Sequence, residues 1–254
     1  MSKSKLLAST LIIVALGANA SFAAPLKGGV KVNGNVDQTT TVLGQVTSNA
    51  TGIAASSTLR VGSVTNSDVG DNLKQNTFVG GRVTSAATGI AAHSATTIGS
   101  VDQADVKGNL KQDTTVLGLV DTAATGIAAS ADTEIGVLEN VEVAGNADQS
   151  TTVLGKVTNN ATGIASHARV DIGKVKGATV GGNLRQSTFV GGQVTNAATG
   201  IAARSVTEIG KVNNADVGGN LKQNTLIIGV ANTTATGIAA KSCTSVGTIG
   251  ESDC

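Results

Sequence analysis

The tetrapeptide Thr-Gly-Ile-Ala at 51–54 recurs at 88–91, 125–128, 162–165, 199–202 and 236–239. Each step is 37 residues, without insertion or deletion. A fixed period of this length is typical of solenoids and other repeat arrays. Six units fill the chain from residue 33 to its last residue, with boundaries at 33–69, 70–106, 107–143, 144–180, 181–217 and 218–254.

Three polar positions keep the same 37-residue step. They are an Asn column (Asn35, Asn72, Asn109, Asn146, Asn183, Asn220), a Gln column (Gln38, Gln75, Gln112, Gln149, Gln186, Gln223) and a Thr column (Thr40, Thr77, Thr114, Thr151, Thr188, Thr225). Stacked repeats place each residue over its counterpart. A buried amide column is stable when each member hydrogen-bonds to the neighbours above and below. We therefore expect these columns to form structural ladders that fix the register.

The repeat predicts strands and not helices. It is rich in Thr, Val and Gly, lacks a 3.6-residue apolar stripe, and alternates at Val42, Gly44 and Val46. The mature chain has no Trp or Tyr, so its core must be thin. We expect an all-β solenoid resembling a parallel β-helix. The Ala50, Ile53 and Val46 columns should supply its dry core, with Ala231 replacing Val in the last unit.

A weaker echo divides each unit. Gly192 and Gly210 begin related segments within the fifth unit, and Gly229 begins the corresponding segment of the sixth. This alternation favours twelve coils of about 18 or 19 residues, a rod about 58 Å long at about 4.8 Å per coil. The alternative is one coil per 37-residue unit, a rod about 29 Å long.

The N-terminus has the pattern of an export signal. Lys3 and Lys5 precede an apolar run from Leu6 to Leu16, and small residues at Ser21 and Ala23 predict cleavage after Ala23. We expect residues 1–23 to be a signal peptide and residues 24–32 a leader. The apolar run is too short for a stable transmembrane helix. The processed chain is thus expected to be secreted, at the cell surface or outside the cell, without a membrane span.

Composition and motifs argue against several function classes. Without Lys3 and Lys5 the chain has 16 basic and 17 acidic residues, a formal charge of −1, which argues against a nucleic-acid partner. We predict no enzyme active site, cofactor or metal site, because no nucleophile–base grouping or metal motif recurs. His93 and His167 share a variable column and are expected to be solvent-exposed. The acidic column (Asp68, Asp105, Glu142, Asp216, Asp253) is expected to be a solvated face.

The last unit holds both cysteines, Cys243 and Cys254. Export to an oxidising space favours a disulfide between them, with intermolecular pairing as the alternative.

The ends of the array suggest self-association. Solenoids usually have atypical polar caps, and an uncapped end exposes free backbone groups. The first unit resembles the inner ones, and the last contains the apolar stretch Leu226-Ile227-Ile228, a candidate assembly end. We expect head-to-tail docking of identical chains into a filament. The alternative is a monomer capped by the leader or by the cysteine-containing C-terminus.

The segment Gly-Gly-Asn-Leu-Lys-Gln at 218–223, with its relatives in other units, resembles the spaced Gly, Asn and Gln of curlin and other bacterial functional-amyloid subunits. The resemblance implies a secreted β-solenoid that stacks into extracellular fibres of a biofilm matrix, helped by secretion or nucleator proteins. Two alternative functions are a monomeric surface adhesin and an ice-binding solenoid. An outward-facing Thr40 column would support ice binding.

Overall fold

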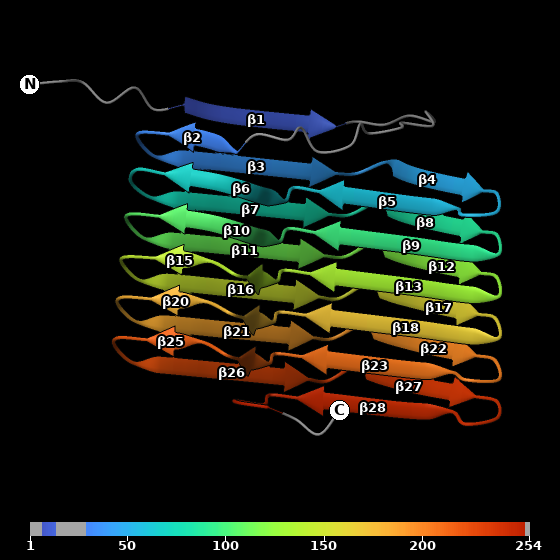
Figure 1. The fold of residues 1–254 in the computed structure, drawn as a ribbon. Coiled ribbons are helices and arrows are strands. Elements are labelled where there is room, and N and C mark those ends of the chain that lie inside the picture. The colour runs from blue at the N-terminus through green and yellow to red at the C-terminus, as the bar shows by residue number, and fades with distance from the viewer. Residues whose placement is uncertain (1–6, 14–28, 252–254) are drawn as a thin grey trace, which may run out of the picture.

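The computed structural model describes residues 7–13 and 29–251, and it is an all-β solenoid (Figure 1). Parallel strands stack on one another, and the described residues form no helix. None of these segments could therefore cross a membrane as an apolar helix. The six-repeat solenoid expected from the sequence is confirmed.

One coil of the solenoid is one whole sequence unit. Gln38 pairs with Gln75, and Gln75 pairs with Gln112, so each residue lies beside its counterpart in the next unit. The prediction of twelve coils, each half a unit in size, is therefore wrong. Six coils at about 4.8 Å each give a rod about 29 Å long. Coils 1 to 6 correspond to the six sequence units.

Coils 1 to 5 contribute strands to four parallel sheets, and the described part of coil 6 contributes strands to three of them, sheets A, C and D. Sheets A and C form one broad face, behind the other two in Figure 1. Sheet A contains β1 (Leu7–Ile13), β3 (Val36–Val42), β7 (Leu73–Val79), β11 (Leu110–Val116), β16 (Ala147–Val153), β21 (Leu184–Val190) and β26 (Leu221–Ile227). Sheet C contains β4 (Gln45–Thr51), β8 (Arg82–Thr88), β12 (Leu119–Thr125), β17 (Lys156–Thr162), β22 (Gln193–Thr199) and β27 (Val230–Thr236).

Sheets D and B form the opposite face, in front in Figure 1. Sheet D contains β5 (Ser56–Val61), β9 (Ala91–Ile98), β13 (Ala128–Ile135), β18 (Ala165–Ile172), β23 (Arg204–Ile209) and β28 (Lys241–Val246). Sheet B contains β2 (Val30–Val32), β6 (Val64–Val69), β10 (Val101–Val106), β14 (Leu138–Glu139), β15 (Glu142–Val143), β19 (Val175–Lys176), β20 (Thr179–Val180), β24 (Val212–Asn213) and β25 (Asp216–Val217).

The half-repeat echo reflects these two faces. Strand A passes into strand C at the Gly44 column, and strand D passes into strand B at the Gly62 column. A Cβ at Gly81 would lie 1.9 Å from the Gly44 carbonyl oxygen, so the first kink needs glycine because the coils approach closely. Gly62 has φ +60°, a left-handed conformation that favours glycine. Two similar kinked faces in one coil produce similar sequences half a unit apart.

The core is a thin layer between the two faces. Val, Leu and Ile columns fill it near the two kinks and at the end where sheets A and B meet. Alanine columns, including Ala87, Ala124 and Ala161, fill the end where sheets C and D meet. The Val46 and Ala50 columns point inward as expected. The Ile53 column does not, since Ile53 is 77 % exposed and Ile127 is 51 % exposed.

Candidate assembly surfaces

The Asn column forms a ladder along the surface. The side-chain Nδ2 and backbone N–H of Asn72 both donate to Asn35 Oδ1, at 2.9 and 3.0 Å. The backbone N–H of Asn220 donates to Asn183 Oδ1 at 2.9 Å. These bonds join Asn side chains of successive coils, but the column lies at the surface and is not a buried amide column. It has a direction, because each Oδ1 from Asn35 to Asn183 accepts from the Asn of the next coil, whereas the Oδ1 of Asn220 accepts from no group in the described residues.

The Gln and Thr columns point into the core, but neither forms a ladder of like side chains. Gln112 Nε2 instead donates across the core to the carbonyl of Gly99, at the kink between sheets D and B. Thr114 Oγ1 donates to the same carbonyl at 3.2 Å. The Thr hydroxyls of coils 2 to 5 all bond in this way, each to the kink carbonyl of the preceding coil. These columns therefore tie successive coils together by satisfying kink carbonyls.

Both ends interrupt this pattern. At the first coil, Thr40 is 2 % exposed and its Oγ1 has no hydrogen-bond partner among the described residues. At the last coil, the Thr225 Oγ1 likewise lacks a partner, and within the described residues no donor reaches the carbonyl of Gly247, which occupies the kink position. The first coil thus has a Thr40 hydroxyl without an acceptor, and the last coil has a Gly247 carbonyl without a Thr donor.

The inward side chains of the last coil are more exposed than their counterparts. Gln223, Thr225 and Ala231 are half-buried, whereas the same columns in coils 2 to 5 are nearly inaccessible. In the candidate assembly end, Ile227 faces inward and packs against the core. Leu226 and Ile228 face outward, with 49 % and 72 % exposure. Only Ile227 therefore belongs to the end face of the core.

The first coil has partly occupied edges. β2 pairs with β6 from Val30↔Ser67 to Val32↔Val69, which covers part of the first sheet B strand. β1 pairs in parallel with β3, from Leu7↔Val36 to Ile13↔Val42. This strand lies within the predicted signal peptide. The predicted cleavage site at Ala23 lies outside the described residues.

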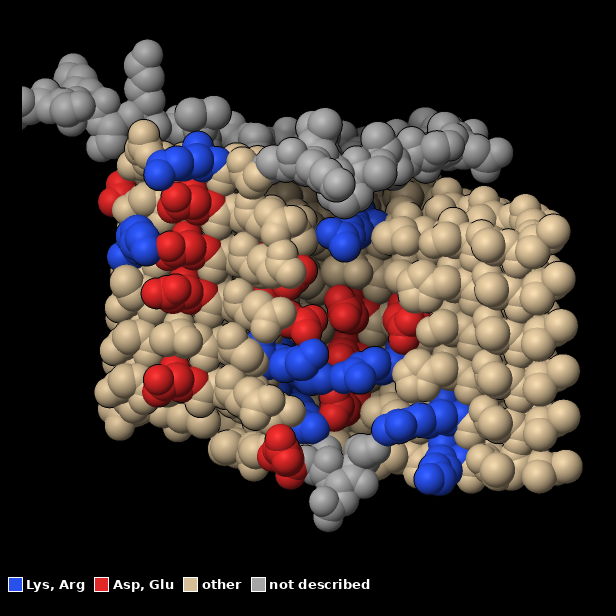
Figure 2. All heavy atoms as spheres, in the orientation of Figure 1, with Lys and Arg blue, Asp and Glu red and all other residues tan. Residues whose placement is uncertain are grey.

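A charged groove runs along the front face, between sheets D and B (Figure 2). Arg169 Nε lies 3.0 Å from Asp171 Oδ2, and Arg169 Nη2 lies 2.9 Å from Glu208 Oε2. Lys174 Nζ contacts both carboxylates, and Lys211 Nζ lies 2.7 Å from Glu208 Oε1. Burial alone would raise the pKa of Glu208, but hydrogen bonds from the two lysines outweigh it and lower the pKa to about 2. This network links coils 4 and 5.

Glu134 occupies the same groove in coil 3, without an ion pair or hydrogen bond in the described part of the chain. Burial raises its pKa to about 7, with further contributions from the charges of Asp171 and Glu139. It lies between two surface hollows of about 320 and 180 Å³, both also lined by Arg60. These hollows are lined by side chains of both charges.

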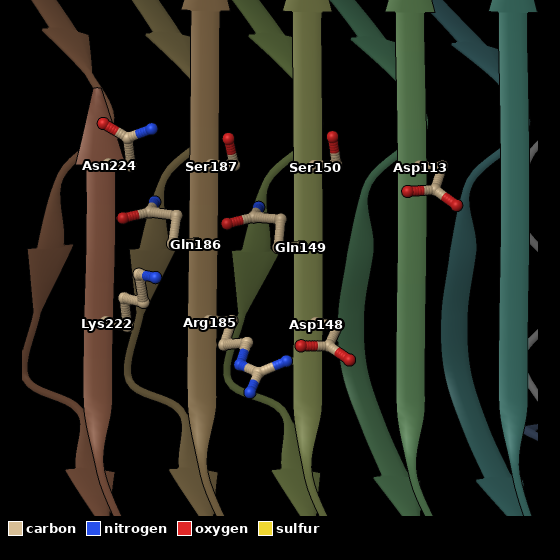
Figure 3. Close-up of a pocket in the computed structure, with 9 residues that line it drawn as sticks. All are labelled: Asp113, Asp148, Gln149, Ser150, Arg185, Gln186, Ser187, Lys222 and Asn224. Carbon is tan, nitrogen blue, oxygen red and sulfur yellow. The ribbon is translucent and has the colours of Figure 1, made fainter. Parts of the chain in front are cut away.

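A third hollow, of about 480 Å³, lies on the outer face of sheet A (Figure 3). Asp148 and Arg185 lie next to each other there on neighbouring strands, with Lys222 on the last strand. Its lining spans four coils, with acidic side chains in coils 3 and 4 (Asp113, Asp148) and basic side chains in coils 5 and 6 (Arg185, Lys222). The hollow thus lies where side chains of different length and charge follow one another on neighbouring strands.

The histidine and acidic columns lie on the outer surface. His93 and His167 are two coils apart with Ser130 between them, or about 10 Å, and not the four coils that the smaller coil implied. His93 is exposed, whereas His167 is half-buried and its pKa is lowered by burial. Asp68 and Asp105 pair with Lys31 and Lys107. Across residues 7–13 and 29–251, no group of three or more His, Cys, Asp or Glu side chains is placed to hold a metal ion.

The two cysteines are described unequally. Cys243 lies in β28 and is disulfide-bonded. Cys254, its predicted partner, lies outside the described residues.

Sequence reasoning missed the charged groove. The sequence pattern that indicates the groove is an acidic residue three positions before a lysine. It recurs at the same place in two successive repeats, as Asp171-Ile-Gly-Lys174 and Glu208-Ile-Gly-Lys211. Once the coil is known, the acid and the lysine of each segment lie on opposite sides of the kink. Comparisons with protein-family models, curated proteins and solved structures found no match.

Proposed function

We propose that this chain is a structural subunit of an extracellular fibre, in which the last coil of one copy stacks on the first coil of the next. The proposal depends on one observation. The strands of sheets A, C and D keep their one-unit register from the first coil to the last, so the edges of these three sheets at the two ends have the same geometry as edges between inner coils.

Complementary hydrogen-bonding groups support the junction. Continuing the register by one coil would place the next copy's Asn35 over Asn220. Its backbone N–H and Nδ2 would then donate to Asn220 Oδ1, as those of Asn72 donate to Asn35 Oδ1. The next copy's Thr40 would donate to the Gly247 carbonyl, as Thr77 donates to that of Gly62 at 3.3 Å. The first coil thus supplies hydrogen-bond donors, and the last coil supplies the matching acceptors.

Charge and apolar contacts favour the same alignment. Lys222 would lie beside the next copy's Asp37, in the column where Lys74 Nζ lies 3.6 Å from Asp37 Oδ2 within the chain. Ile227 would be covered by the next copy's Val42. Both contacts resemble ones already made between neighbouring coils of the chain, the Lys74–Asp37 ion pair and the pairing of Val190 with Ile227.

Export gives a route to assembly outside the cell. Cleavage after Ala23 would remove β1 and free the edge of β3 for another copy. The curlin resemblance, with its extracellular biofilm fibres, agrees with this order of events. The argument for ice binding from the Thr40 column no longer holds, because that column is buried.

The test is polymerisation of the chain that begins at Ala24, which keeps all six coils. We expect filaments in electron micrographs and a diffraction spacing of about 4.8 Å along their axis. A protein that stays monomeric in sedimentation at high concentration, even with added fragments of sonicated material, would contradict the proposal.

Two variants locate the junction. Ile227→Asp would bury an unpaired carboxylate at the docked end, at a cost of about 3–5 kcal/mol, and should abolish filaments. Ile228→Asp, one residue away and facing outward, is the matched control and should polymerise. Thr40→Val should leave the stability of the monomer unchanged or higher, because the hydroxyl has no partner in the described part of the chain. It should raise the critical concentration about five-fold, for one lost bond of about 1 kcal/mol.

A further inference from the structure

One narrow edge of the solenoid has the same exposed apolar residue in every coil. The edge is the turn from sheet C to sheet D, at the right in Figure 1. Its isoleucines are between 50 and 77 % exposed (Ile53, Ile90, Ile127, Ile164, Ile201, Ile238). The Thr51 and Ala54 columns beside them are also exposed in all six coils. The edge is thus a continuous row of isoleucine with small neighbours.

The fold explains why these side chains point outward. The interior at this end is filled by alanine columns, which leave room for no larger residue. The turn itself is closely packed, because a Cβ at Gly89 would lie 1.7 Å from the Gly52 carbonyl oxygen. Geometry therefore places the side chain at position 53 of each coil in solvent, but it does not require that side chain to be apolar.

Other outward columns vary freely. The column that begins at Ser56, three residues along, contains Ser, His, Arg and Lys. The Ile column has no substitution, and residues 49–55 carry no charge in any of the six coils. The charged groups gather on the faces, and this edge is uncharged in Figure 2. A uniform exposed apolar row of this kind marks an interaction surface.

The area of the edge restricts the partner. Six coils give a length of about 29 Å, and two sheets about 10 Å apart give the width, so one chain offers about 290 Å². A stable interface needs about 800 Å² from each partner. Single chains should therefore not pair through this edge. Three or more chains stacked end to end would offer enough area.

We propose that this Thr-Gly-Ile-Ala edge joins two rods of the same chain side by side, edge to edge. The inference rests on the proposed head-to-tail fibre. A facing row with the same spacing can interdigitate its isoleucines along the whole length, in the manner of a dry zipper between sheets. The absence of charge at the edge means that two copies approach without like-charge repulsion.

Electron microscopy and mass per length of filaments, together with sedimentation of the monomer, test the proposal. Wild-type filaments should have twice the mass per length of a single rod, whereas unpolymerised chains should sediment as monomers. The double variant Ile127→Lys with Ile164→Lys should still elongate but should form single rods of half the mass. The matched control, Leu117→Lys with Leu154→Lys, changes two exposed leucines of the same coils on the broad face formed by sheets A and C, away from the edge, and should keep the pairs.

Each other outcome overturns the inference. Pairs that persist in the isoleucine variant, or wild-type filaments that remain single, would exclude edge pairing while leaving head-to-tail assembly intact. Single wild-type filaments that bind phosphatidylcholine vesicles would assign the edge to lipid instead. The absence of any filament would overturn the fibre and the pairing together.

Discussion

Replacing Gly81 by alanine should destabilise the solenoid strongly, because the coils approach most closely at this column. A Cβ at this position would lie 1.9 Å from the Gly44 carbonyl oxygen, whereas real Cβ contacts are essentially never under 3.0 Å. The two coils must therefore separate by about 1.1 Å, the difference between those distances. The hydrogen bond from Arg82 N to Gly44 O is 2.8 Å, and that from Gly81 N to Val42 O is 3.0 Å. Both would exceed bonding distance.

The loss of these two backbone hydrogen bonds at about 1 to 1.5 kcal/mol each gives an expected destabilisation of about 2–3 kcal/mol. Urea unfolding of monomeric protein, followed by circular dichroism, measures it as a midpoint shift of about 1 M or more. The matched control is Gly80→Ala, whose Cβ would meet only side chains, the Phe78 ring at 3.0 Å and Leu43 Cδ2 at 3.4 Å. Midpoints that are equal for the two variants within experimental error would refute the close-approach argument.

Three further predictions concern buried polar groups. Glu134 has its pKa raised to about 7, so unfolding stability should fall as pH rises from about 4.5 to 7, and Glu134→Gln should remove that slope in urea titrations at several pH values. The pKa of Glu208 is lowered to about 2, so its contribution to the free energy of unfolding is complete above about pH 4.5 and is lost as pH falls towards 2. Glu208→Gln should therefore lower stability at pH 7 and reduce the loss of stability between about pH 4.5 and 2. Gln112→Leu should cost about 1–3 kcal/mol in the same unfolding assay because it leaves the Gly99 carbonyl without its amide donor, whereas Lys111→Leu, on the outer surface, should cost under about 0.5 kcal/mol.

The fold was predictable because the repeat leaves few choices. An uninterrupted 37-residue period with alternating Val and Gly favours stacked strands over any helical array. The size of the coil was not predictable in the same way, because similarity between segments does not distinguish two stacked coils from two faces of one coil. The positive φ of Gly62 and the close approach at Gly44 serve the same purpose, a kink, on opposite faces.

The columns illustrate a second limit. A column of identical residues predicts stacking, but it does not say which way the side chains point. Ile53 was expected inside on hydrophobicity alone, yet the alanine-filled end has no space for it. The Gln column was expected to bond along itself, yet from coil 2 onward each Gln side chain donates across the core to a glycine carbonyl at the kink between sheets D and B. Both outcomes depend on the thickness of the coil at that point, which no local pattern in the sequence specifies.

The constant register between coils also bears on how such a gene can change. Because each residue pairs with its counterpart in the adjacent repeat, removal of residues 107–143 would bring coil 2 directly onto coil 4, with Asn72 next to Asn146 and Gln75 next to Gln149. Duplication of one whole repeat would be tolerated for the same reason. Gains or losses of complete repeats should thus alter rod length in steps of about 4.8 Å, whereas a deletion one residue longer or shorter would turn inward side chains outward in part of the molecule. Recombination between repeats is therefore a route to variants of different length that still fold.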